Sequence, residues 1–155
     1  MREKKDIKRL LPQRGLLLGI KVEVKSNIKK RVDFVNKKFA TRQNRWVDAT
    51  GSYFRNQIAL EMTTSPPTGK TRTKENGVEH TSSSVGNPPR VDTGVLRSSI
   101  QYKRVRQGIG LVSTNIDYGE DLETKFKRYF MGKQSKAYRN TLVFGKMFAK
   151  NLGLR

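Results

Sequence analysis

The feature that most constrains the fold is a run of apolar residues spaced three or four positions apart between residues 28 and 60. The run skips two polar positions, Arg42 and Asn56, and consists of Ile28, Val32, Val35, Phe39, Trp46, Ala49, Tyr53 and Leu60. Apolar residues at this spacing line one face of an α-helix. The sequence therefore predicts a long amphipathic helix over residues 28–62, with Gly51 as its weak point or bend.

A helix of this length is long for the chain that contains it. At about 1.5 Å per residue it would span roughly 50 Å. The chain has 155 residues, and only 34% of them are hydrophobic. Because such a helix is longer than a compact domain of this size, and because the chain has few apolar residues to bury, we expect contacts with other copies or partner proteins.

The chain is strongly basic, with 33 Lys and Arg against 13 Asp and Glu, a net charge of +20. Such a charge favours contact with a polyanion, which includes nucleic acid, a membrane surface and an acidic protein. The absence of Cys excludes a disulfide-stapled domain and a thiolate zinc site. The apolar runs are too short to span a bilayer, so we expect a soluble protein. We expect no membrane among its partners.

Two segments precede the predicted helix. Residues 1–15 are predicted to form a flexible basic arm, and a short helix over residues 6–11 is the alternative. The arm contains six cations that could face DNA or an acidic partner: Arg2, Lys4, Lys5, Lys8, Arg9 and Arg14. Within residues 16–25, apolar and charged residues alternate over residues 19–25, which predicts a strand with Ile20, Val22 and Val24 on its buried face.

The remaining elements complete a single domain over residues 16–155. Residues 63–94 contain four of the five prolines and are predicted to form an extended loop. Residues 95–105 and 108–114 are predicted to form a hairpin, in which Ile100 and Tyr102 share a face with Ile109 and Leu111. Residues 117–124 are predicted to form a short helix or a turn. Residues 135–152 are predicted to form an amphipathic helix, whose apolar positions are Tyr138, Leu142, Phe148 and Leu152.

These elements predict an α+β fold, in which a small antiparallel sheet packs with a long N-terminal helix and a C-terminal helix, and which includes a long loop rich in Pro, Gly and Ser.

Three short motifs have structural explanations that we prefer to catalytic ones. Gly69-Lys70-Thr71 lacks the first glycine of a phosphate-binding loop. Asp92-Thr93-Gly94 is shared with aspartic proteases, but we expect Asp92 and Thr93 to bond local backbone and Gly94 to form a turn with positive φ. His80 could join Glu75 and Glu79 at a metal ion, although a solvated loop histidine is the favoured interpretation.

A longer pattern resembles a known family. Gly86, Pro88 and Pro89 are followed by Val91-Asp92-Thr93-Gly94, and then by Leu96, Arg97, Ser99 and Ile100. This pattern resembles the neck and tail-completion proteins of tailed bacteriophages, which include the head-tail joining proteins of lambdoid siphophages. The resemblance extends over roughly residues 18–152, but this chain has Glu123-Thr124-Lys125-Phe126 where the family often has Glu-x-Gly-Thr.

The resemblance implies a structural protein without enzymatic activity or cofactor. It would assemble in the host cytoplasm as a homo-oligomeric ring in the virion neck and contact other neck proteins, such as an adaptor or head-closure ring and a tail terminator or tail tube. A ring around the DNA channel could also contact the genome without sequence specificity. The residues that we expect to contact other subunits or partners are Pro88, Pro89, Arg90, Asp92, Thr93, Gly94, Leu96 and Arg97. The alternative is a basic nucleic-acid-binding protein without enzymatic activity, although no helix-turn-helix or zinc-finger motif is present.

Overall fold

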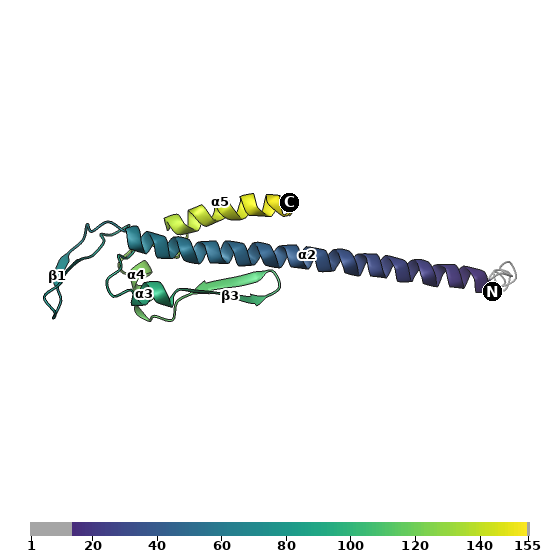
Figure 1. Ribbon diagram of the computed structural model, residues 1–155, viewed down its shortest axis with the longest axis horizontal. Helices are drawn as coiled ribbons and strands as arrows, with labels where there is room; N and C mark the ends of the chain where they lie inside the picture. Colours follow the sequence, from purple (N-terminus) through teal and green to yellow (C-terminus); the bar gives the residue numbers. More distant parts are fainter. Residues whose placement is uncertain (1–13, 155) are drawn as a thin grey trace, which may run out of the picture. The chain divides into compact units, whose positions relative to one another are not determined.

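The computed structural model of the chain describes the backbone of residues 14–154 and the side chains of residues 28–154 (Figure 1). Contacts within the chain define two units, Met1–Ala40 and Thr41–Arg155, which we describe separately. The elements of the described part are α2 (Arg14–Thr64), β1 (Thr71–Thr73), β2 (Glu79–Thr81), α3 (Val95–Ser99), β3 (Gln101–Arg106), β4 (Ile109–Ser113), α4 (Tyr118–Thr124) and α5 (Lys136–Asn151). The predicted α+β class is confirmed, although the strands form two separate antiparallel pairs and not one sheet.

In the first unit, α2 begins at Arg14, so the prediction of a strand over residues 16–25 is wrong. A strand must find a neighbour for its backbone N–H and C=O groups, whereas a helix pairs these groups within itself. Every described strand belongs to a two-stranded ladder, and neither ladder includes this segment. The helix predicted over residues 28–62 is confirmed, and it ends at Thr64.

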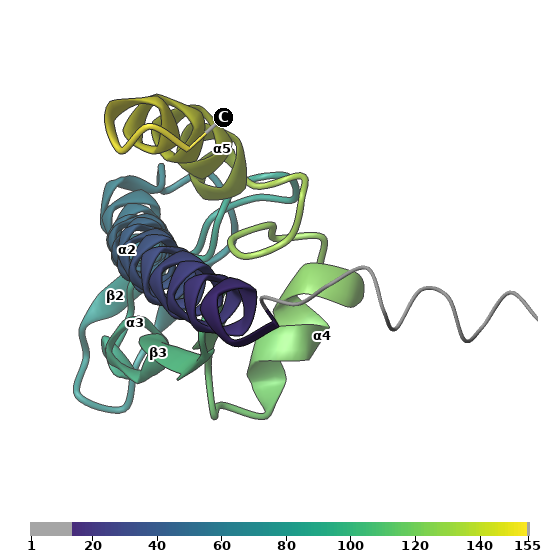
Figure 2. The same cartoon turned by 90° about the vertical axis from the view of Figure 1, so that its right-hand side faces the viewer.

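In the second unit, the C-terminal part of α2 lies between α5 on one side and α3, α4 and the β3–β4 hairpin on the other (Figures 1 and 2). The buried core forms where α2, α3 and the loops next to α5 meet. Its members are Ile58, Met62, Leu96, Ile100, Phe130 and Ala137. Packing of α2 on two sides gives this part of the helix two apolar faces instead of the single stripe that the spacing predicts.

The predicted stripe is half-buried on the side of α2 that faces α5. The indole Nε1 of Trp46 donates a hydrogen bond to the carbonyl of Gly145 at 2.8 Å, and the rings of Tyr53 and Phe144 stack with centroids 4.1 Å apart. Leu60, which the stripe also includes, is 52% exposed, so the stripe is not buried as far as its last member. The deeper core positions of α2 are Ile58 and Met62, which belong to its other face.

Gly51 permits a close approach between α2 and the β3–β4 hairpin. A Cβ atom at Gly51 would lie 2.1 Å from Cε2 of Tyr102, so only glycine leaves room for the ring. The hydroxyl of Tyr102 donates a hydrogen bond to Oδ1 of Asp48 at 2.7 Å. The helix is continuous through Gly51, which therefore serves as a contact position and not as a break in the helix.

The helix predicted at residues 135–152 is confirmed as α5, with Ser135 as its N-cap. The hydroxyl of Ser135 accepts a hydrogen bond from the backbone N–H of Tyr138 at 3.1 Å. The buried face of α5 consists of small residues at every fourth position, Ala137, Thr141 and Gly145. Leu142, one of the apolar positions of the predicted helix, is 48% exposed, because α5 packs on α2 through the small residues instead.

The predicted hairpin is partly confirmed. Residues 95–99 form the helix α3 and not a strand, and β3 pairs with β4 through the turn at residues 107–108. Tyr102 lies opposite Val112, and Lys103 lies opposite Leu111. The predicted phase of the second strand is therefore wrong by one residue, because a bulge between Arg104 and Arg106 shifts the register.

The segment predicted as an extended loop contains the short hairpin β1–β2, so it is not structureless. It is attached to the rest of the unit by hydrogen bonds: the hydroxyl of Ser65 donates to the carbonyl of Pro88 at 2.6 Å, and the N–H of Val91 donates to the carbonyl of Met62 at 3.2 Å. The predicted short helix is confirmed as α4.

The loop after α4 is held by a carboxylate. Oε1 of Glu123 accepts hydrogen bonds from the backbone N–H groups of Phe130 at 2.7 Å and Gly132 at 3.1 Å, and also from that of Met131. Charge-assisted bonds to backbone N–H groups are among the stronger hydrogen bonds in proteins. Glu123 therefore orders this loop even though the residues that follow it depart from the family pattern.

Candidate interaction site around Asp92

Residues 88–97 form a bend that lies beside the C-terminal end of α2 and leads into α3. Pro89 is buried, and the N–H of Val91 is bonded to the carbonyl of Met62. Gly94 has a φ of 83°, as expected for a turn that favours glycine, and Leu96 enters the core. The bend is fixed at both ends, so the side chains between them have defined positions.

Asp92 connects this bend to the β1–β2 hairpin. Its Oδ1 forms an ion pair with Nζ of Lys74 and lies 3.5 Å from Nδ1 of His80. The expectation that Asp92 bonds local backbone is therefore wrong, because cations from the neighbouring hairpin reach its carboxylate. Thr93 behaves as expected: its Oγ1 accepts a hydrogen bond from the N–H of Val95 at 3.4 Å.

The hydrogen bond from Lys74 holds the pKa of Asp92 below its ordinary value. The positive charges of Lys74 and Arg72 act in the same direction. A carboxylate with a lowered pKa stays ionised at neutral pH.

His80 lies on β2 and not in a loop, and its side chain is only 13% exposed. The expectation of a solvated loop histidine is therefore wrong. The alternative metal site with Glu75 and Glu79 does not form either, because the described residues include no cluster of three or more His, Asp or Glu side chains placed to bind a metal ion.

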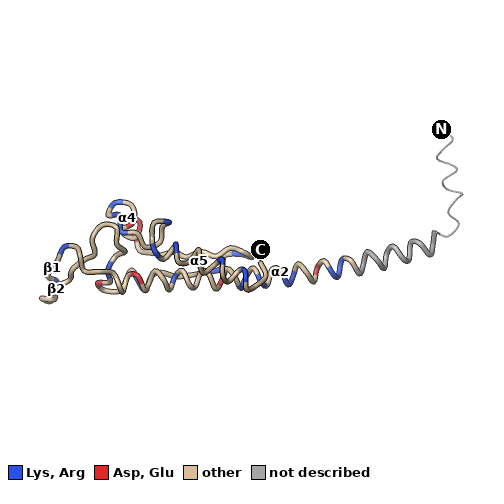
Figure 3. The backbone as a smooth tube through the Cα atoms, turned by 90° about the horizontal axis from the view of Figure 1, so that it is seen from above, with Lys and Arg blue, Asp and Glu red and all other residues tan. Residues whose placement is uncertain are grey.

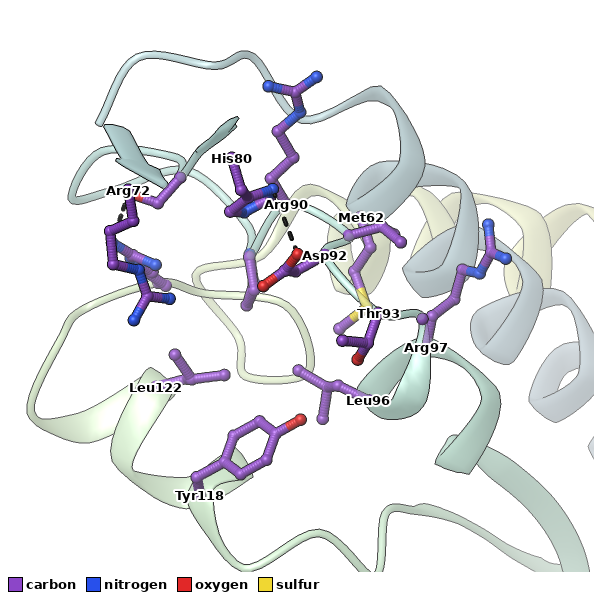
Figure 4. Close-up of a pocket in the computed structure, with 15 residues that line it drawn as sticks. Met62, Arg72, His80, Arg90, Asp92, Thr93, Leu96, Arg97, Tyr118 and Leu122 are labelled. Carbon is purple, nitrogen blue, oxygen red and sulfur yellow. Dashed lines mark hydrogen bonds and ion pairs between the residues drawn. The ribbon is translucent and has the colours of Figure 1, made fainter. Parts of the chain in front are cut away.

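These residues surround a partly open cavity of about 280 Å³ (Figure 4). Met62, Leu96 and Leu122 supply apolar surface, and Tyr118 of α4 lies beside them. Five further lining residues carry basic side chains: Arg72, His80, Arg90, Arg97 and Arg128. Among the lining residues Asp92 is the only carboxylate, and Lys74 already neutralises it.

Three of the arginines are oriented by hydrogen bonds to neighbouring segments. Nη1 of Arg90 donates to the carbonyl of Thr81 at 3.2 Å, and Nη1 of Arg97 donates to Oγ1 of Thr63 at 3.1 Å. Nη2 of Arg128 lies 3.5 Å from Oγ of Ser82, while its buried Nε has no hydrogen-bond partner. Each guanidinium has five N–H groups, so these arginines retain donors for a further anionic group.

The structure brings together most of the residues that the sequence predicts for partner contact. Pro89, Arg90, Asp92, Thr93, Gly94, Leu96 and Arg97 all line the cavity. Pro88 does not: it lines a separate hollow beside Ser65, whose hydroxyl bonds to its carbonyl. Sequence reasoning missed Arg72, His80, Tyr118, Leu122 and Arg128, because only the fold brings β1, β2 and α4 to this bend.

The predicted basic arm lies almost entirely outside the described residues. Arg2, Lys4, Lys5, Lys8 and Arg9 precede the described backbone, and Arg14 is the first residue of α2. The prediction that these six residues contact DNA or an acidic partner stays a prediction.

The arrangement supports recognition better than it supports the catalytic alternatives. Aspartic protease chemistry requires two carboxylates that share a proton, whereas Asp92 is bound to Lys74. Gly69-Lys70-Thr71 leads into the strand β1, whereas a phosphate-binding loop leads into a helix. A cavity with apolar walls and free guanidinium donors suits a carboxylate carried on an apolar segment.

No protein-family model matches the chain, and comparisons with curated proteins and with solved structures find no match. None of the helices in the described part of the chain has the length and apolar character needed to cross a membrane.

Proposed function

We propose that the protein is a structural component of the neck of a tailed bacteriophage. Several copies form a ring that joins or completes the connection between head and tail around the DNA channel. The observation that carries the proposal is the family pattern at residues 86–100, which forms one wall of the cavity around Asp92. The contact with a neighbour is made there, where a carboxylate of the neighbouring subunit or ring meets the arginines.

Apolar surface elsewhere in the second unit supports assembly into an oligomer. On α5, Val143 and Met147 are 61% and 60% exposed, and on β4 Leu111 is 53% exposed. Large exposed apolar side chains gathered on an element mark surfaces that contact other proteins. Two such surfaces on different elements suit a ring, in which each copy uses one surface toward each neighbour.

The high positive charge supports a place beside the genome. Lys and Arg occur along both units, while acidic residues are few (Figure 3). Cations that line a channel hold DNA through its phosphates without reading its sequence.

The same charge also supports the second candidate, a basic nucleic-acid-binding protein that acts outside the virion. Binding through several phosphates weakens by orders of magnitude between low and moderate salt. Strong, salt-sensitive binding to duplex DNA, together with normal virions when the protein is missing, would favour this candidate.

The deciding experiment is electron microscopy of particles from a lysate in which the gene is silenced and then complemented. We expect full heads beside separate finished tails without the protein, and joined infectious particles after complementation. Intact virions without the protein would overturn the proposal.

The same assay tests the contact surface. Complementation with Arg97→Glu should leave heads and tails separate, because the change reverses a charge at the cavity. Lys133→Glu is the matched control, since this exposed side chain in the loop before α5 does not line the cavity and the variant should restore joining. Equal rescue by both variants would show that residues 88–97 do not form the joining surface.

A further inference from the structure

The first unit exposes a row of apolar side chains on α2. Ile28, Val32, Val35 and Phe39 are 56%, 49%, 61% and 54% exposed. We call these four residues the seam. Scattered single apolar residues on a surface are ordinary, but a continuous row of them marks a place where another molecule binds.

The spacing of the seam indicates that its occupant is a helix. Its steps of four, three and four residues are those of the a and d positions of a heptad repeat, the pattern by which two helices pack side by side. Further along the sequence the same spacing reaches Trp46 and Tyr53, and in the second unit these side chains contact the helix α5.

The residues beside the seam define the charge of that helix. In heptad terms the flanking e and g positions are Lys29, Arg31, Asn36 and Lys38. Three of the four are cations and none is an acid. Over residues 28–40 there are five basic residues and one acid, Asp33 (Figure 3).

From these observations we propose that the seam is a docking site for an amphipathic helix of another protein that carries Asp or Glu beside its apolar face. A second copy of the same segment would bring a single acid, Asp33, which lies at a b position away from the e and g flanks, against three flanking cations. Nucleic acid would pair with the cations but would leave the apolar row uncovered. An acidic amphipathic helix satisfies both the apolar row and its cations, and this holds whether or not the protein belongs to a phage neck.

Two synthetic peptides serve as probes of the full-length protein. Both contain about four heptads with Ile at a and Leu at d. One carries Glu at every e and g position, and the other carries Lys there. We expect saturable binding of the acidic peptide in fluorescence anisotropy, at least tenfold tighter than that of the basic peptide.

Two alanine variants test the position of the binding surface. Val35→Ala should weaken binding of the acidic peptide about tenfold, because it removes apolar surface from the middle of the seam. Phe34→Ala is the matched control: Phe34 is 57% exposed on the same turn, but it lies outside the seam and beneath Nζ of Lys38, 4.3 Å from its ring centre. It should change binding less than twofold. Alanine favours helices, so neither variant should unfold this segment, which circular dichroism will check.

A charge variant tests the second half of the proposal. Lys29→Glu combined with Arg31→Glu should weaken binding of the acidic peptide about tenfold and strengthen that of the basic peptide.

Several outcomes would overturn the proposal. One is the failure of both peptides to bind, and another is equal binding of the two. A larger loss with Phe34→Ala than with Val35→Ala would show that the interaction is unspecific. Self-association that Val35→Ala abolishes in sedimentation equilibrium would make a second copy the occupant. If duplex DNA competed with the acidic peptide and still bound the Val35→Ala variant, the occupant of the seam would be nucleic acid.

Discussion

Two stretches of α2 carry the same apolar spacing and are buried to very different extents. Val35 and Phe39 are 61% and 54% exposed, whereas Ile58 and Met62 are 0% and 1% exposed. Helix propensity and spacing do not distinguish the two stretches. The difference comes from what the rest of the chain provides around residues 46–62, where α5, α3 and the β3–β4 hairpin cover the helix.

The comparison is tested most strongly by removing an aliphatic side chain from each stretch. Ile58→Ala should lower the free energy of unfolding by about 2–5 kcal/mol, because it leaves a cavity in the core. Val35→Ala should change it by less than about 0.5 kcal/mol, since the side chain is exposed. Urea denaturation of both variants measures the two values. Similar losses would mean that the seam is covered in the isolated protein.

The next largest effect is expected where α2 touches the hairpin. Gly51→Ala should destabilise the protein by about 1–3 kcal/mol, since the new methyl group overlaps the ring of Tyr102. In a Tyr102→Ala background the same change should stabilise the protein, because alanine then contributes only its better helix propensity, about 1 kcal/mol. A Gly51→Ala effect of the same sign in both backgrounds would exclude the ring as the cause.

Elements with strong local signals could be predicted from the sequence. The helix over residues 28–62, α4, α5 and the β3–β4 turn follow from spacing, capping residues and glycine. The strand predicted over residues 16–25 is wrong, because a strand depends on a partner strand that its own residues do not specify. The prediction of a strand at residues 95–99 is wrong for a related reason: the turn at Gly94 leads into a short helix before β3 begins.

The buried face of a helix and the residues that line the cavity depend on contacts between distant segments, so the sequence predicted them only in part. Small residues at 137, 141 and 145 set the buried face of α5, and apolarity alone pointed to Leu142 instead. The family pattern indicated Asp92 and Arg97, and Arg90 lies within the segment that carries it. It gave no sign of Arg72 or His80, which reach the cavity through the β1–β2 hairpin.

Phe39 and Trp46 lie one heptad apart on α2, one in the exposed stretch and one in the covered stretch, so they extend the comparison to aromatic side chains. Trp46→Phe should cost about 1–2 kcal/mol, because it removes the hydrogen bond to the carbonyl of Gly145 and part of a packed ring. Phe39→Leu should change stability by less than about 0.5 kcal/mol. Thermal unfolding of both variants gives the comparison, and a loss for Phe39→Leu as large as that for Trp46→Phe would contradict it.

The last prediction concerns the proton on Tyr102, which reports whether the hairpin covers α2 in solution. Burial, followed by the hydrogen bond to Asp48 and the charge of that carboxylate, raises the pKa of Tyr102 to about 12, against an ordinary value of 10.0. The folded state therefore holds this proton more tightly than the unfolded state does. The stability that it contributes is present below pH 10 and is lost as the pH rises from about 10 toward 12.

Ultraviolet titration of the tyrosines measures this shift directly. Tyr102 should titrate with a pKa of about 12 in the wild-type protein, and this transition should be missing from Tyr102→Phe. Asp48→Asn should move its pKa back toward the ordinary value, because the amide removes the negative charge that opposes ionisation. Arg104 also lies 3.4 Å from Asp48 and lowers the pKa of Tyr102 slightly, so Arg104→Gln should shift it in the opposite direction. If Tyr102 ionised near the ordinary value of 10.0, the hairpin would not be closed over α2, and the contrast between the covered and exposed stretches of the helix would lose its basis.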